Sequence, residues 1–171
     1  MKIVLVGYMG SGKSTIGRLL AKKLKYVFID LDEYIESSER SDIATIFEKK
    51  GEIYFRKKEY GYLKEILENK DDFVLSTGGG TPCYGENMTA ISTETKNVFY
   101  LKVSIAGLIE RLISEKENRP LIANIPNKEL PEFIGKHLFE RSYFYSRAQH
   151  TVLCDNESVN TLVDTIYKLL V

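Results

Sequence analysis

Short apolar runs rich in β-branched and aromatic residues alternate along this chain with longer stretches in which apolar residues recur every three or four positions. The runs lie at residues 2–6, 26–29, 73–76, 97–102 and 151–154. Runs of this length predict buried strands, and the stretches between them predict helices. Because strands that alternate with helices build parallel sheets, we expect an α/β fold in which helices cover a parallel sheet.

Two polar segments interrupt this alternation. Residues from about 32 to 69 form a polar helical stretch, which we call the flap, and residues from about 115 to 131 form a charged stretch with prolines, which we call the lid. Long polar connections in a compact domain are commonly binding flaps or lids, or else disordered. The length of 171 residues suits one domain that spans residues 1–171.

Composition narrows the class of partner. The 24 Lys and Arg residues balance the 24 Asp and Glu residues, so no overall basic field attracts nucleic acid or an anionic membrane. Two cysteines, Cys83 and Cys154, make no disulfide framework, and no apolar run is long enough to span a bilayer. We therefore expect small-molecule partners, no nucleic acid, no membrane and a cytoplasmic location.

The first apolar run leads directly into Gly7-Tyr8-Met9-Gly10-Ser11-Gly12-Lys13-Ser14-Thr15, a full match to G-x-x-x-x-G-K-[ST]. In this motif backbone N–H groups converge on phosphate, the lysine reaches the outer phosphates and the hydroxyl after it ligates Mg²⁺. Helical spacing of apolar residues after Lys13 places a helix N-terminus at the same point. The motif predicts nucleoside triphosphate binding by Gly10, Ser11, Gly12, Lys13, Ser14 and Thr15.

Acidic and glycine-rich sequences follow two other predicted strands. Asp30 and Asp32 follow the second strand, where residues two apart in extended chain face the same side, so both can point at the triphosphate. The alternative is a helix N-cap with a first-turn charge. Gly78-Gly79-Gly80 follows the third strand and suggests close backbone approach to a ligand, although a flexible turn is the other interpretation.

Single arginines are weaker signals. Arg119 lies in the lid, where a mobile guanidinium can close over the γ-phosphate, and Arg141 lies on a predicted helix, where a surface salt bridge is the default role. Two motif matches are set aside. Asn69-Lys70-Asp71-Asp72 fits the N-K-x-D pattern that reads guanine but precedes its strand, and Gly10-Ser11-Gly12 fails the dinucleotide pattern because position 15 is Thr.

Taken together, the motifs resemble those of shikimate kinases along nearly the whole chain. They are the phosphate loop, Asp30-x-Asp32, Gly51-Glu52-x-x-Phe55-Arg56-x-x-Glu59, Gly78-Gly79-Gly80, Arg119-Pro120-Leu121 and Leu138-x-x-Arg141-x-x-x-Tyr145. The resemblance implies a three-layer P-loop kinase fold with a five-stranded parallel sheet in the order 2-3-1-4-5. It also implies transfer of the γ-phosphate of ATP to the 3-hydroxyl of shikimate in aromatic amino-acid biosynthesis, by an enzyme that is usually a monomer.

Residue roles follow from the same resemblance, position by position. Lys13, Asp32 and Arg119 would be catalytic, with Asp32 accepting the hydroxyl proton, and Ser14 and Asp30 would support Mg²⁺. The substrate would be bound by Asp32, Arg56, Gly78, Gly79, Gly80 and Arg141, and Arg111 would stack on adenine. The chain after the last strand, near Asn156, does not align well enough for an assignment.

Two other functions remain open at this point. A gluconate-type or nucleotide kinase would share the same core, although a pair of arginines favours a carboxylate on the acceptor. A noncatalytic module or a GTP switch would hold the nucleotide without transferring its phosphate. ADP release that depends on the acceptor separates these functions.

Overall fold

Five parallel strands form the centre of the protein in the computed structural model, which describes residues 1–69 and 72–171. The strands of this described part lie in the order β2-β3-β1-β4-β5, as the resemblance implied. Their bounds are β1 Lys2–Val6, β2 Val27–Asp30, β3 Phe73–Ser76, β4 Val98–Lys102 and β5 His150–Leu153. The second and fifth strands are shifted by one residue from the predicted runs, and the shift of β2 places Asp30 inside the strand.

Helices fill the connections between strands, as the alternating pattern predicted. Their bounds are α1 Lys13–Leu24, α2 Leu31–Glu39, α3 Ile43–Glu68, α4 Asn87–Glu94, α5 Ile105–Glu115, α6 Pro120–Ala123, α7 Leu130–Tyr145 and α8 Val159–Leu170. Short 3₁₀ turns occur at Thr81–Cys83, Lys116–Asn118 and Asn127–Glu129. Four of these helices begin at a side chain that accepts a backbone N–H, those of Asp30, Asp42, Ser104 and Ser158.

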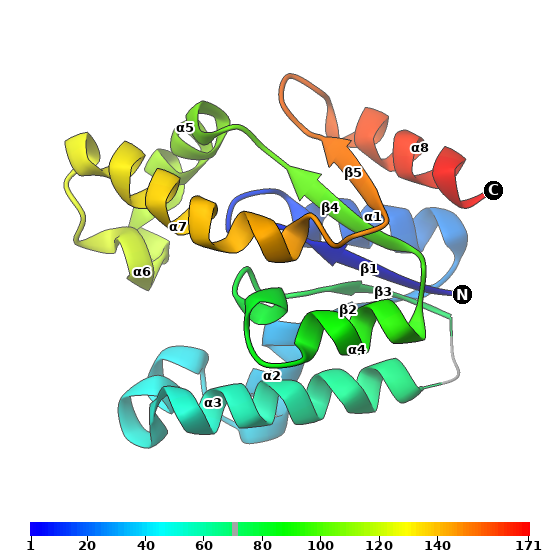
Figure 1. Cartoon of the computed structure of the whole chain (residues 1–171), viewed down its shortest axis with the longest axis horizontal. Helices are drawn as coiled ribbons and strands as arrows, with labels where there is room; N and C mark the ends of the chain where they lie inside the picture. Colours follow the sequence, from blue (N-terminus) through cyan, green and yellow to red (C-terminus); the bar gives the residue numbers. More distant parts are fainter. Residues whose placement is uncertain (70–71) are drawn as a thin grey trace.

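The helices cover both faces of the sheet (Figure 1). Helices α4 and α7 lie in front of the strands in this view and α1 lies behind them, packed against α8. The lid and the beginning of α3 in the flap lie at the left of the picture, the side toward which the carboxyl ends of the strands point, and the rest of α3 runs below the sheet. Because ligands of parallel sheets bind beyond these ends, the two segments flank the expected site.

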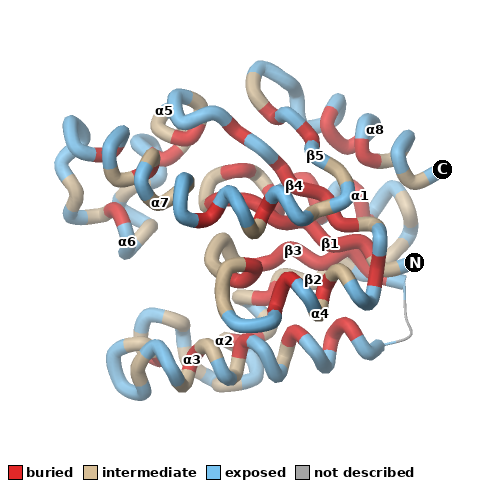
Figure 2. The backbone as a smooth tube through the Cα atoms, in the orientation of Figure 1, coloured by how far each residue is buried: buried red, intermediate tan, exposed pale blue. Residues whose placement is uncertain are grey.

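The buried core runs along the sheet and fades toward both extensions (Figure 2). Ile3, Val4, Leu5 and Val6 of β1 are fully buried, as expected for a central strand covered on two faces. In the lid, by contrast, Leu121 is 61% exposed, while Ile122 and Leu130 are buried and attach the segment to the rest of the domain. The lid is therefore fixed at a few apolar points.

The flap consists of α2 and α3, and α3 is broken at Gly51. Gly51 has φ 82° and ψ 170°, a left-handed conformation that strongly favours glycine. We call residues 43–50 the first arm and residues 52–68 the second arm. Phe55 and Glu59 of the second arm are buried, at 4% and 1% exposure, so one face of this arm is part of the interior.

Two further sequence observations can be placed. Within the described residues, no helix is both long and apolar enough to cross a membrane. The set-aside motif Asn69-Lys70-Asp71-Asp72 contains residues 70 and 71, so it lies partly outside the described residues.

Candidate functional site

The phosphate loop connects β1 to α1, as the motif predicted. Gly12 stands at the N-terminus of α1 with φ 93°, a conformation in which a larger residue is strained, and Lys13, Ser14 and Thr15 form the first turn. Ser11 N–H donates to the Tyr8 carbonyl at 3.1 Å and closes the loop. Since Gly12 brings no side chain to cap the helix, the first N–H groups of α1 are free to face an anion.

Lys13 lies folded over this loop. Its Nζ donates to the carbonyls of Gly7 at 2.8 Å and Tyr8 at 3.0 Å, and its side chain is buried. Burial lowers the pKa of the Lys13 ammonium to about 8, and the nearby carboxylates of Asp32 and Asp30 oppose that shift. Carbonyl dipoles and two acids thus hold a desolvated cation beside a helix N-terminus.

The Asp30 carboxylate accepts hydrogen bonds from two different parts of the site. Its Oδ1 accepts the backbone N–H of Asp32 at 3.1 Å, which caps α2, and its Oδ2 accepts the Ser14 hydroxyl at 2.6 Å. The helix-cap alternative is therefore correct for Asp30, and the contact with the loop is present as well. The premise that Asp30 and Asp32 share a face of extended chain is wrong, because Asp30 ends β2 and Asp32 already lies in the first turn of α2.

Asp32 nevertheless faces the loop. Burial raises the pKa of its carboxyl to about 6; Asp30 and Glu59 raise it further, and Lys13 opposes them. A carboxyl with this pKa is mostly ionised at neutral pH and still binds a proton readily, which suits a general base.

Arg56 of α3 and Arg141 of α7 meet at the triple glycine, although 85 residues separate them in the chain. A Cβ placed on Gly80 would lie 3.1 Å from Arg56 Nη2 and 3.3 Å from Arg141 Nη2. Arg141 is 9% exposed, so a surface salt bridge is not its role. We call Arg56 and Arg141 the acceptor clamp, because two guanidinium groups at one point bind a carboxylate well.

The three glycines make room for the side chains of the site. A Cβ on Gly78 would lie 2.9 Å from Asp32 Oδ1, and one on Gly79 would lie 3.2 Å from the Met9 nitrogen and 3.4 Å from Arg141 Nη1. At these distances an added side chain fits only if its neighbours shift. The glycines were expected to admit a ligand, and they also admit Asp32 and the acceptor clamp.

Glu59 is a site residue that the predictions left out. Its carboxylate is 1% exposed, accepts from Arg56 Nη1 at 2.6 Å and accepts from the Thr81 hydroxyl at 2.7 Å. The Arg56 guanidinium also lies 3.6 Å from the ring centre of Tyr84. The i,i+3 spacing from Arg56 to Glu59 was the available signal, since such pairs face each other on a helix.

Two hydrogen bonds join α7 to the site. The Tyr8 hydroxyl lies 2.9 Å from His137 Nδ1, and burial, followed by the charge of Arg141, lowers the pKa of His137. The Tyr145 hydroxyl donates to the Gly79 carbonyl at 2.6 Å. Helix α7 therefore contacts both the phosphate loop and the triple glycine.

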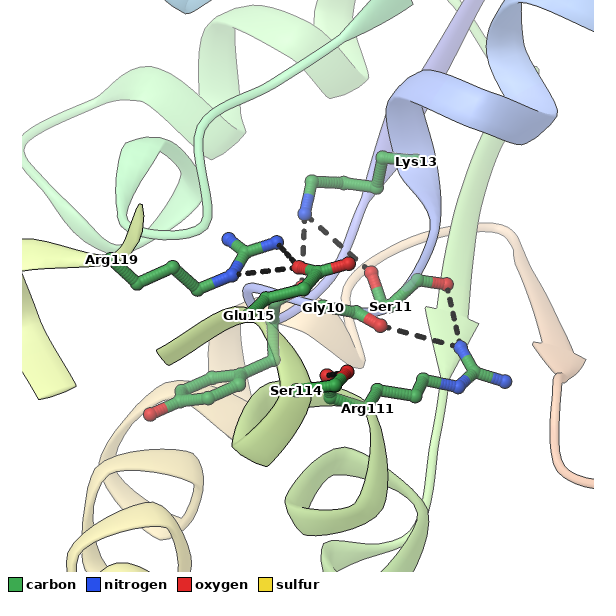
Figure 3. A network of polar contacts seen from close by, with 8 residues as sticks. Gly10, Ser11, Lys13, Arg111, Ser114, Glu115 and Arg119 are labelled. Carbon is green, nitrogen blue, oxygen red and sulfur yellow. Dashed lines mark hydrogen bonds and ion pairs between the residues drawn. The ribbon is translucent and has the colours of Figure 1, made fainter. Parts of the chain in front are cut away.

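Arg111 and Arg119 approach the loop from the other side (Figure 3). Arg111 donates to the carbonyls of Gly10 at 3.3 Å, Ser11 at 3.4 Å and Cys154 at 2.9 Å, so it ties the loop to the end of β5. Arg119 Nε donates to Glu115 at 3.0 Å, and its side chain is one-third exposed. Neither contact was foreseen from the sequence.

The donor set beside Ser14 fits a magnesium ion. The Ser14 hydroxyl and the Asp30 carboxylate lie side by side at the N-terminus of α1, and Mg²⁺ prefers such oxygen ligands while keeping several waters. No cluster of three or more His, Cys, Asp or Glu residues suited to a metal occurs in the described part of the chain. A Mg²⁺ ion here would rest on these two residues, water and phosphate.

Comparison with known proteins gives one consistent family. The shikimate kinase family model matches residues 9–171. A shikimate kinase of Flavobacterium psychrophilum is 47% identical over 169 residues, covering 99% of this chain and 98% of the relative.

Solved structures agree with this assignment. The shikimate kinase of Bacteroides thetaiotaomicron superposes with a TM-score of 0.92 at 36% identity, over 99% of this chain and 98% of its own. The shikimate kinase of Acinetobacter baumannii, solved in complex with shikimate, superposes with a TM-score of 0.88 at 33% identity, over 99% and 92% of the two chains. With a family model matched over most of its length and a relative of this identity, the chain belongs to the shikimate kinase family.

Proposed function

We propose that this protein transfers the γ-phosphate of ATP to the 3-hydroxyl of shikimate, giving shikimate 3-phosphate and ADP in aromatic amino-acid biosynthesis. The observation that carries the proposal is the position of the acceptor clamp. Arg56 and Arg141 converge at Gly80, next to Asp32 and across from the loop that holds Lys13. A hydroxylated ring with a carboxylate fits between them, its carboxylate on the arginines and a hydroxyl beside Asp32.

In this proposal the nucleotide binds the phosphate loop and the residues beside it. The loop N–H groups and Lys13 hold the phosphates, and Arg111 offers its planar group to the adenine ring. The nucleotide-binding residues are then Gly10, Ser11, Gly12, Lys13, Ser14, Thr15, Arg111 and Arg119. A Mg²⁺ ion on Ser14 and, through water, on Asp30 would supply charge neutralisation for the phosphates.

Transfer needs alignment and charge stabilisation more than covalent chemistry, because the phosphoryl group passes through a loose anionic transition state. Asp32 orients the acceptor hydroxyl and takes its proton as the oxygen attacks phosphorus. Lys13 and Arg119 stabilise the charge that spreads over the transferred oxygens and the leaving ADP. Gly78, Gly79 and Gly80 let the ring approach the backbone closely.

The fixed position of Arg56 argues against the rival kinases. A gluconate-type acceptor also has a carboxylate, but it is an open chain, whereas Glu59 and Tyr84 hold Arg56 in one position and Thr81 in turn donates to Glu59. Fixed donors select a rigid acceptor, because a flexible one loses more conformational entropy on binding.

A coupled assay of ADP release tests the proposal. Purified protein with ATP and Mg²⁺ is supplied in turn with shikimate, gluconate, other hydroxy acids and nucleoside monophosphates. We expect turnover with shikimate at least a hundredfold above every other acceptor, and a single phosphomonoester at the 3-hydroxyl in the NMR spectrum of the product. ADP release at the same rate without an acceptor would leave only the nucleotide-switch function.

Location and assembly are part of the same proposal. A cytoplasmic monomer fits two free thiols, a half-buried one on Cys83 and a buried one on Cys154. Light scattering across a hundredfold range of concentration should give one mass, that of a single 171-residue chain. A mass that doubles with concentration would contradict the monomer.

A further inference from the structure

The charged carboxylate of Glu39 has little exposure to solvent. It is the last residue of α2, and its side chain is 6% exposed. A negative charge at a helix C-terminus is unfavourable because it faces the negative end of the helix dipole. Removing a carboxylate from water also costs free energy unless hydrogen bonds replace the water. Strong partners must therefore hold this group.

Two tyrosines of the second arm of the flap supply hydrogen bonds to the Glu39 carboxylate. The Tyr54 hydroxyl donates to Glu39 Oε2 at 2.6 Å, and the Tyr62 hydroxyl donates to Oε1 at 2.6 Å. Lys58 Nζ lies 3.3 Å from Oε1, and Lys50 Nζ lies 3.6 Å from Oε2. We call these five residues, Glu39, Lys50, Tyr54, Lys58 and Tyr62, the Glu39 hub.

The Glu39 hub joins three parts of the flap. Glu39 ends α2, Lys50 ends the first arm immediately before the break at Gly51, and the other three residues lie on the second arm. Tyr54, Lys58 and Tyr62 are four residues apart, so they form one stripe along the helix. The two tyrosine bonds, two turns apart, fix both the rotation and the axial position of this arm.

The contacts of the Glu39 hub lie on the side of the second arm opposite to the acceptor clamp. Arg56 follows Tyr54 by two residues, which places it about 200° around the helix axis. Glu59 is held to the interior by Arg56 and Thr81. A rotation of the arm that swings the hub stripe outward therefore displaces Arg56 from Gly80.

We propose that Glu39 is a positioning residue for the acceptor clamp, acting through Tyr54 and Tyr62 to fix the second arm and, with it, the Arg56 guanidinium. This inference rests on the proposed function, since it concerns the affinity for the acceptor. The hydrogen bonds from Tyr54 and Tyr62 lower the pKa of the Glu39 carboxyl to about 2, so the group they hold is an ionised carboxylate at neutral pH.

The test compares Glu39→Gln with the wild-type enzyme in steady-state kinetics with shikimate and ATP. We expect the KM for shikimate to rise about tenfold, as loss of a charge-assisted contact allows, while kcat and the KM for ATP stay within about twofold. Glu39→Asp, which keeps the charge on a shorter stem, should give an intermediate KM. Wild-type turnover of shikimate in the same experiment tests the proposed function separately.

The chain offers a matched control in Tyr34 and Glu65. The Tyr34 hydroxyl donates to Glu65 at 3.0 Å, so this pair also joins α2 to the second arm through a tyrosine and a glutamate, but in an exposed position. Glu65→Gln should leave the KM for shikimate unchanged. An unchanged shikimate KM in Glu39→Gln, or equal changes in the KM values for shikimate and ATP, would overturn the inference.

A second pair of variants covers the case in which Glu39→Gln does not fold. Tyr54→Phe and Tyr62→Phe keep both rings and each remove one hydroxyl. Each should raise the shikimate KM by a smaller factor than Glu39→Gln, and the double variant should reach that factor. Wild-type shikimate KM in the folded double variant would overturn the inference equally.

Discussion

The flap and the lid flank the same site but are built differently. In the flap, the charges that face the acceptor are already paired: Glu59 is 1% exposed, and Arg56 contacts Glu59 and the ring of Tyr84. In the lid, Arg119 pairs with Glu115, whose side chain is 53% exposed. An exposed pair contributes little free energy and is exchanged easily, whereas a buried one is costly to break.

This difference divides the work of the enzyme between the two segments. In the proposed function, the flap presents a preformed acceptor clamp that sets which acceptor binds. The lid would exchange the Glu115 contact of Arg119 for phosphate, so it would contribute when the nucleotide and the acceptor are both present. Changes in the flap should therefore appear in the KM for shikimate, and changes in the lid should appear in kcat.

The largest expected effect comes from the lid. Arg119→Ala should lower kcat about a thousandfold, the magnitude typical of arginines that stabilise phosphoryl transfer, and should leave the KM for shikimate nearly unchanged. Steady-state kinetics at saturating ATP measure both constants. Lys116→Ala removes a neighbouring lid cation that bonds to Asn127 and serves as the control, with kcat close to that of the wild type. A raised shikimate KM with unchanged kcat in Arg119→Ala would remove the distinction between the segments.

The acceptor clamp should give the opposite signature. Arg56→Ala and Arg141→Ala should each raise the KM for shikimate roughly a hundredfold, since each leaves a bound carboxylate short of a charged partner, with the KM for ATP unchanged. Arg56→Lys should recover only part of the loss, because an ammonium cannot bind bidentately. Calorimetric titration with shikimate checks the same point without turnover. Wild-type affinity in both alanine variants would rule out the clamp.

The acid limb of the pH profile should report Asp32. The pKa of this carboxyl is raised to about 6, chiefly by burial, and the proposed base must be ionised. We expect kcat/KM for shikimate to fall about tenfold per pH unit below pH 6, because kcat/KM follows the ionisation of the free enzyme. Asp32→Asn should have a much lower kcat and no such limb. An unchanged limb in this variant would assign the ionisation to another group.

The smallest expected effect concerns stability. An acid whose folded pKa is raised loses stability as pH increases from its unfolded pKa, near 4, through its folded pKa, near 6. Asp32→Asn removes that cost, roughly 3 kcal/mol for a pKa raised from near 4 to near 6, so its Tm should exceed the wild-type Tm by about 5–10 °C at pH 8 and match it at pH 4. Scanning calorimetry at both pH values measures the difference. A lower Tm at pH 8 would mean that the ionised Asp32 contributes to stability.

Most of the fold could be predicted from the sequence, because the features that define the strands and helices are local. Apolar runs identified all five strands to within a residue, and the phosphate-loop motif placed the start of α1. The strand order came from the family resemblance, since no periodicity in the sequence encodes which strands are neighbours.

The site was harder to predict from the sequence, because its contacts join residues that are distant in the chain. The Glu39 hub requires knowledge that α2 packs on α3, and the Tyr8–His137 bond spans 129 positions. Asp30 and Asp32 were correctly predicted to lie near the loop, but from a wrong premise. The prediction assumed extended chain through Asp32, whereas α2 already begins at Leu31. Sequence patterns give the chemistry of single residues, whereas tertiary packing decides their partners.

The crowding at Gly78, Gly79 and Gly80 has a consequence for inhibition. A compound that packs on this backbone meets a surface where substitution is constrained, because an added side chain would press on Asp32, Met9 or the acceptor clamp and make them shift. A mutation that excluded the compound there would also displace Asp32 or the acceptor clamp, the groups proposed to bind the acceptor. Resistance to such a compound would have to arise elsewhere in the enzyme, and the lid, where few contacts are fixed, is the segment with room for it.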